Sequence, residues 1–137
     1  MADLLKDLAG YLFYEGAIDG EAIDTFCDYE PDEPDEIISL HEYAGPPTAT
    51  GVEALDRNVQ VVVRALPENV EWARAKIWEI FNLLDTPTDR VLDTREHYPN
   101  GTRWGVLFSR QTPFMMGRDP VGRVKYAFNI GITTYRD

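Results

Sequence analysis

Cysteine is nearly absent from this 137-residue sequence, and long hydrophobic runs are missing altogether. The single cysteine, Cys27, cannot form an internal disulfide, which excludes a secreted domain held together by disulfides. No hydrophobic run exceeds four residues, whereas a membrane-spanning helix needs about 18 or more. The first residues are acidic where a signal peptide would be basic, so we expect a protein made in the cytoplasm, with no membrane partner.

Basic residues are also scarce in the first part of the chain, and none lies between Lys6 and Arg57. Residues 1–56 carry one Lys or Arg against fifteen Asp or Glu, whereas residues 57–137 carry twelve against nine. At a net charge of −11, the chain lacks the basic face that sequence-independent nucleic-acid binding requires. The hydrophobic content of 44% is typical of a globular chain. We therefore expect one domain, residues 1–137, whose unequal charges could serve self-association or docking.

Recognisable catalytic motifs are missing as well, since the sequence has no nucleophile elbow, no phosphate-binding loop and no Cys-x-x-Cys pair. His41, His97 and Cys27 are far apart in sequence, so we predict no metal site and no cofactor. The acidic residues 28–36 lack the glycine and the ligand spacing of an EF-hand, which favours a solvated or partner-facing loop. Two alternatives stay open: a small hydrolase that depends on this acidic cluster, and a small-ligand-binding module.

Hydrophobic residues at intervals of three and four predict two amphipathic helices. The first covers residues 2–15 and has Leu4, Leu5, Leu8, Leu12 and Phe13 on its apolar side. The second begins at Pro67 and is ended by Pro87. Its apolar stripe consists of Val70, Ala73, Ile77, Ile80, Phe81 and Leu84. Residues 16–36 between the first helix and the first strand are expected to be irregular.

Alternating apolar and polar residues predict four strands, over residues 37–43, 58–66, 103–110 and 123–136. Asp119-Pro120-Val121-Gly122 has the residue preferences of a type I turn. We therefore expect a long C-terminal hairpin from Trp104 to Tyr135, with this turn near its tip. The element order predicts an α+β fold with a mostly antiparallel sheet of four to five strands and two main helices packed on one face.

Several side chains fall outside the predicted core and are candidates for a subunit or partner interface. Trp72 and Trp78 lie off the apolar stripe of their helix, which is consistent either with partial burial or with a contact surface. Phe114, Met115 and Met116 place adjacent apolar side chains in the hairpin, where they either fold back or bind a partner. The full candidate set is Asp28, Glu30, Asp32, Glu33, Asp35, Glu36, Trp72, Trp78, Arg110, Phe114, Met115, Met116, Arg118 and Arg123.

Three stretches in this order resemble the tail terminator or minor capsid proteins of long-tailed bacteriophages. They are the Pro-Asp-x-Pro-Asp turn and strand at residues 31–45, the strand at Val59–Arg64, and the Pro, Gly-x-Asp and Gly-Arg hairpin at residues 113–123. Met115-Met116 before Gly117 and the acidic run before Pro31 depart from the family pattern. A related role as a head-completion or neck protein therefore stays open.

The resemblance implies a structural virion protein without catalytic activity. Its relatives form a homo-hexameric ring that caps the tail tube, contacts the tube protein and the head–tail connector or stopper protein, and lets DNA pass without specific binding. A ring subunit must carry two different, complementary faces. We expect an acidic face from residues 19–36 to meet an arginine-bearing face of the hairpin, or else to keep the lumen acidic.

Overall fold

The computed structural model describes residues 4–43, 54–85, 92–93, 103–109 and 111–135. Its elements follow the order helix, strands, helix, strands that the sequence predicts, so the α+β class is confirmed. The elements are α1 (Leu4–Tyr14), β1 (Thr25–Cys27), β2 (Ile37–Tyr43), β3 (Ala54–Ala65), the short 3-10 helix η1 (Pro67–Asn69), α2 (Val70–Leu84), β4 (Leu92–Asp93), β5 (Arg103–Ser109), β6 (Phe114–Arg118) and β7 (Val124–Tyr135).

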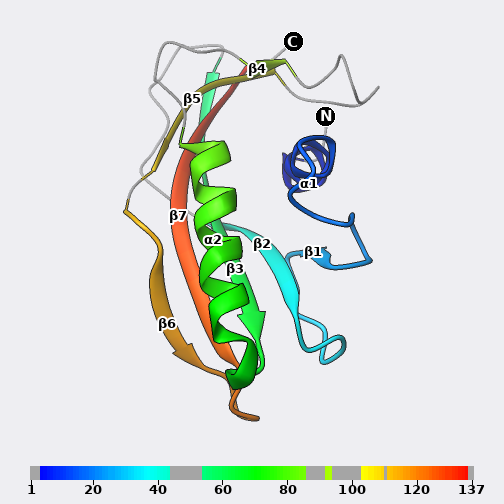
Figure 1. Ribbon diagram of the computed structural model, residues 1–137. Coiled ribbons are helices and arrows are strands. Elements are labelled where there is room, and N and C mark those ends of the chain that lie inside the picture. The colour runs from blue at the N-terminus through cyan, green and yellow to red at the C-terminus, as the bar shows by residue number, and fades with distance from the viewer. Residues whose placement is uncertain (1–3, 44–53, 86–91, 94–102, 110, 136–137) are drawn as a thin grey trace.

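The sheet is built around the two longest strands, β3 and β7, which pair along twelve residues each. Its order is β1-β2-β3-β7-β5-β4, and β6 also pairs with β7. Only the β1–β2 pair is parallel among the described strands, so the sheet is mostly antiparallel, as expected. Figure 1 shows β6 along one side of the molecule, with β1 and β2 on the other.

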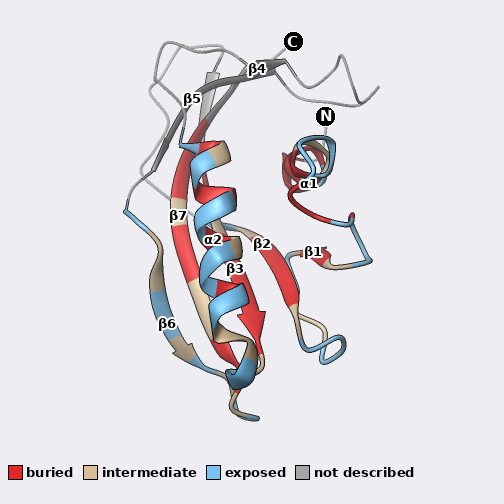
Figure 2. Cartoon of the chain, viewed as in Figure 1, coloured by how far each residue is buried: buried red, intermediate tan, exposed pale blue. Residues whose placement is uncertain are grey.

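The hydrophobic core lies between α2 and one face of this sheet. Val59, Val61 and Val63 of β3 point to that face, and Ile77 of α2 packs against it, all with essentially no solvent exposure. Figure 2 shows the same division: the strand surfaces behind α2 are buried and the outer side of α2 is exposed. Burying one such side chain stabilises the fold by about 1.5–3 kcal/mol. The alternation of β3 and the stripe of α2 therefore fix which side of each element faces inward.

The sequence predicts two main helices packed on one face of the sheet, whereas in the structure the two helices lie against different strands. α2 lies along β3 and β7, whereas α1 packs beside β1 and β2 at the other end of the sheet and runs in a different direction (Figure 1). α1 still contributes Leu4, Leu5, Leu8 and Leu12 to the common core. Phe13 was expected on the apolar side but is 53% exposed.

The C-terminal hairpin is also more divided than predicted. β5 pairs with the end of β7 and the separate strand β6 pairs with its beginning, so both lie along the same edge of β7. The predicted turn is confirmed: the Gly122 amide donates to the Asp119 carbonyl at 2.9 Å. Gly122 has φ +92°, a conformation that residues with a Cβ rarely adopt. Residues 16–36 are mostly irregular, as expected, but include β1.

Candidate functional site

The acidic loop (residues 28–36) is held against β2, β3 and β7. Asp28 anchors its start, because its amide donates to the Leu40 carbonyl at 2.7 Å and its carboxylate accepts the Glu42 amide at 3.3 Å. Both contacts are to β2. The start of the loop is thereby tied to the strand that follows the loop in sequence.

Arg64, buried on β3, binds the main chain of this loop. Its Nη2 donates to the carbonyls of Pro31 and Pro34, each at 2.7 Å, and its Nε donates to the carbonyl of Asp35 at 3.2 Å. Burial, followed by the nearby positive charge of Arg123, lowers the pKa of the Arg64 guanidinium. Arginine nevertheless stays charged in proteins. Arg64 therefore holds the shape of the loop without using its carboxylates.

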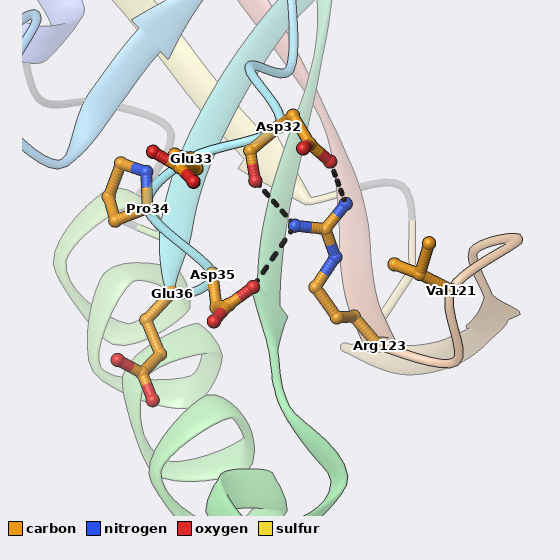
Figure 3. Close-up of a pocket in the computed structure, with 7 residues that line it drawn as sticks. All are labelled: Asp32, Glu33, Pro34, Asp35, Glu36, Val121 and Arg123. Atoms are coloured by element: carbon orange, nitrogen blue, oxygen red, sulfur yellow. Dashed lines mark hydrogen bonds and ion pairs between the residues drawn. The ribbon is translucent and has the colours of Figure 1, made fainter.

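Arg123 binds the side chains of the loop and lies directly after the turn that joins β6 to β7. Its Nε donates to Asp119 Oδ2 at 2.6 Å, and its Nη2 donates to Asp32 Oδ1 at 3.2 Å. Its Nη1 reaches the Asp32 carbonyl at 2.6 Å and Asp35 Oδ1 at 3.3 Å. In Figure 3 the guanidinium of Arg123 lies between the Asp32 and Asp35 side chains. The side chain of Arg123 is only 7% exposed, so these contacts satisfy a nearly buried cation.

Asp119 connects this cluster to the turn. Its Oδ1 accepts the amides of Val121, at 3.1 Å, and Arg123, at 2.9 Å. Burial raises the pKa of the Asp119 carboxyl, but the hydrogen bonds and charge of Arg123 outweigh burial, so the pKa lies below its ordinary value. Burial likewise opposes the charge of Arg123, yet the contacts with Asp119 and Asp32 raise its pKa above the ordinary value. Asp119 and Arg123 therefore form an ion pair that stays charged across the neutral range.

Two further contacts complete the attachment of the loop. Lys125 Nζ on β7 lies 3.1 Å from Glu30 Oε2, and Asn69 of η1 donates to Glu36. We use the name "loop clamp" for the following set: Arg64, Arg123, Asp119, Lys125 and the loop residues that these four bind.

An open pocket of about 740 Å³ lies over the loop clamp, lined by residues 32–36, Val121 and Arg123 (Figure 3). The carboxylates of Asp32 and Asp35 contact Arg123 there. A contact between His41 Nε2 and Ser39 Oγ, 3.0 Å long, lies elsewhere on β2. Ser39 is completely buried, so its hydroxyl is closed to a substrate. Among the described residues, no group of three or more His, Cys, Asp or Glu could hold a metal ion.

The predicted interface residues fall into three groups in the structure. The buried Arg123 and the loop residues Glu30, Asp32 and Asp35 belong to the loop clamp, and Asn69 binds Glu36 within the same subunit. The large exposed apolar members are Trp72, Trp78, Met115 and Met116. Asp28, Glu33 and Arg118 are exposed and Phe114 is half-buried, while Arg110 lies outside the described residues. The interface role of the set stays a prediction.

Sequence reasoning missed Arg64, Asp119 and Lys125 as members of one cluster. Arg64 lies on the polar side of the strand predicted over residues 58–66, and the sequence indicated Asp119 only as a turn residue. A lone arginine within a hydrophobic strand was the available signal, because a buried cation needs partners. Its partners lie about 30 residues earlier in sequence, a pairing that local patterns do not specify.

Comparison of the sequence with known proteins shows the family of this chain. The family described as bacteriophage tail terminator protein matches residues 14–136, which covers the loop clamp and every strand. No curated protein matches the sequence. Within the described part of the chain, no helix is long and apolar enough to cross a membrane.

Proposed function

Because this chain belongs to the bacteriophage tail terminator family, we propose that its copies form a ring that caps the completed tail tube and joins the tube to the head connector. The family match over residues 14–136 carries this proposal. The partners are further copies of the chain, in a hexamer, together with the tail tube protein and the head–tail connector or stopper protein. The role is structural and needs no catalytic group.

The two ends of the sheet support a ring of this kind. One edge carries β1 beside acidic residues. β6, which pairs with β7 outside the β1-to-β4 strand order, forms an edge on the other side and carries exposed methionines and Arg118. A closed ring joins one face of each subunit to a different face of the next. Unlike faces at opposite ends of one sheet meet that requirement, whereas two identical faces would favour a closed dimer.

The negative charge of the subunit suits a ring through which DNA passes. Each copy carries a net charge of −11, and exposed Asp28, Asp32 and Glu33 lie on the acidic loop. DNA adheres to proteins chiefly by exchanging its counterions for Lys and Arg side chains. An acidic ring therefore lets the genome move past without binding it.

Deleting the gene from the phage that encodes this chain tests the proposal, with wild-type protein supplied from a plasmid as the control. We expect tails of irregular length that fail to join heads, and recovery of normal virions upon complementation. Uniform tails joined to heads would contradict the proposal. Uniform tails that stay separate from heads would instead favour a head-completion role.

A further inference from the structure

β6 is an edge strand of the sheet that carries exposed apolar side chains. β6 pairs with β7 along one side, and no other described strand lies along its outer side. Met115 and Met116 are 48% and 41% exposed on this strand. Their register is broken by a bulge between Met115 and Gly117. An edge strand with free backbone groups and apolar side chains readily recruits another chain.

A cation at the end of β6 gives this edge a charge. Arg118 is exposed, and its Nη1 contacts the Gly122 carbonyl at 3.3 Å. Arg57 and Lys76, in contrast, are held in ion pairs, with Glu42 at 2.6 Å and with Glu79 at 2.8 Å. The guanidinium of Arg118 is therefore available to a carboxylate on another molecule.

A second pocket, of about 440 Å³, lies near the opposite edge of the sheet. Two residues contribute apolar surface: Ile23, from the turn before β1, is 63% exposed, and Trp72, from the first turn of α2, is 38% exposed. Acidic residues, including Asp19 and Glu36, also line it. We name it the Ile23–Trp72 pocket. Its apolar walls and negative side chains complement the methionines and the arginine of β6.

The backbone around β1 favours side-chain docking at this pocket over extension of the sheet. The Ala22 amide donates to the Thr25 carbonyl at 2.8 Å, and the Thr25 amide donates to the Gly20 carbonyl at 3.3 Å. The turn before β1 thus already uses backbone groups of that strand. A flexible methionine side chain, in contrast, adapts to an irregular cavity and makes favourable contacts with an aromatic ring.

We propose that the β6 edge of one subunit docks into the Ile23–Trp72 pocket of the next subunit. Met115 and Met116 pack against Ile23 and Trp72, and Arg118 pairs with the acidic side chains of the pocket. This inference rests on the proposed function, since it names the contact that closes the ring. Because β1 and β6 occupy opposite edges of the sheet (Figure 1), the contact is head-to-tail and repeats around the ring.

Disulfide cross-linking between two singly substituted proteins tests this contact. Cys27→Ser removes the native thiol, and Met116→Cys and Ile23→Cys are introduced on this background in separate proteins. The two proteins are mixed under mild oxidation, and ring formation is followed in the same samples by mass photometry, alone and with purified tail tubes. Asn82→Cys, exposed on α2 away from the pocket, replaces Ile23→Cys in the matched control. Urea unfolding of each variant checks that the fold is retained.

The expected result is a cross-linked Met116→Cys/Ile23→Cys dimer, at least tenfold more abundant than the dimer formed with Asn82→Cys. Rings that form without this cross-link would overturn the proposed contact and leave the proposed function standing. A cross-link between two copies of Met116→Cys would also overturn it, because that product requires a two-fold contact. If no ring and no cross-link form, even with tail tubes present, both the contact and the proposed function are contradicted.

Discussion

Arg118 and Arg123 stand at the two ends of a single turn, yet they face different environments. Arg123 is nearly buried and binds Asp119, Asp32 and Asp35 within its own subunit. Arg118 is exposed and contacts only one backbone carbonyl among the interactions described for it. Two arginines that look equivalent in sequence therefore differ in the structure: Arg123 stabilises the subunit, whereas Arg118 is exposed, and only the proposed contact assigns it to assembly.

The same division applies to the acidic loop. The sequence predicts that the acids either meet the hairpin arginines of a neighbouring subunit or line the lumen of the ring. In the structure Arg123 and Lys125 meet Asp32, Asp35 and Glu30 inside one subunit. Three of the fifteen acidic residues in residues 1–56 thus serve to attach the loop to the sheet. The proposed contact between subunits uses Arg118 and the acidic side chains of the Ile23–Trp72 pocket instead.

The largest effect is expected from Arg123→Ala, which leaves a carboxylate cluster without its cation. Removing one partner of a buried pair costs about 3–5 kcal/mol, and we expect a loss near the lower end, about 3 kcal/mol, because Asp32 and Asp35 remain partly in water. Urea unfolding measures the difference. Arg118→Ala is the matched control and should change the free energy of unfolding by less than about 0.5 kcal/mol. Equal losses in the two variants would remove the distinction between them.

Asp119→Asn should sharpen the assignment of Arg123 to folding through its dependence on pH. Asn keeps an oxygen for the turn amides but lacks the charge, so we expect a loss of about 1.5 kcal/mol at pH 7. The depressed pKa of Asp119 means that its charge stabilises the folded state above the unfolded pKa, about 3.9. This contribution disappears as pH falls through the folded pKa. Urea unfolding between pH 7 and 3 should show the two proteins converging below about pH 4, and a constant gap would contradict the ion pair.

Met116→Asp should affect assembly and leave the subunit intact. It places a negative charge opposite the acidic side chains of the Ile23–Trp72 pocket and removes an apolar contact, so we expect about tenfold weaker ring formation, or about 1.4 kcal/mol. Mass photometry measures assembly, and urea unfolding checks the fold. Thr112→Asp, at another exposed position before β6, provides the matched control. Equal weakening by both variants would point to general repulsion and not to this contact.

The smallest effect is expected from Arg118→Glu. Exposed ion pairs contribute about 0–1 kcal/mol each, so ring formation should weaken by up to about fivefold. The difference from wild type should shrink between 50 and 500 mM salt, because salt screens exposed charges. The same titration by mass photometry gives this dependence. Wild-type behaviour at low salt would remove Arg118 from the interface while leaving the methionine contact in place.

Local patterns in the sequence identified most of the fold. The alternation of Val59, Val61 and Val63 and the spacing of Ile77 and Ile80 correctly give the buried faces of β3 and α2. Alternation in twos is the repeat of a strand, and intervals of three and four are the repeat of a helix. Burial of one face of each element requires that repeat in its sequence. β1 and β6 were missed because three and five residues are too short to show alternation, and a bulge interrupts β6.

The sequence identified several residues of the candidate site but not which of them contact each other. The acidic loop, Arg118 and Arg123 were all singled out, yet nothing local to Arg123 says that Asp32, 91 residues earlier, is its partner. That pairing depends on where β3 and β7 lie in the sheet. Long-range contacts between charged side chains follow from the assembled fold, whereas periodicity reports only on one element at a time.

Cryo-electron microscopy of virions of the phage that encodes this chain would locate the protein and its subunit contacts in one experiment. We expect a ring of this protein at the end of the tail tube that faces the head. In that ring, β6 of each subunit should lie at the subunit boundary against the Ile23–Trp72 pocket of the next, and Arg123 should remain inside its own subunit. A ring in which β6 faces solvent or the DNA channel, or a tail end without this protein, would contradict the account.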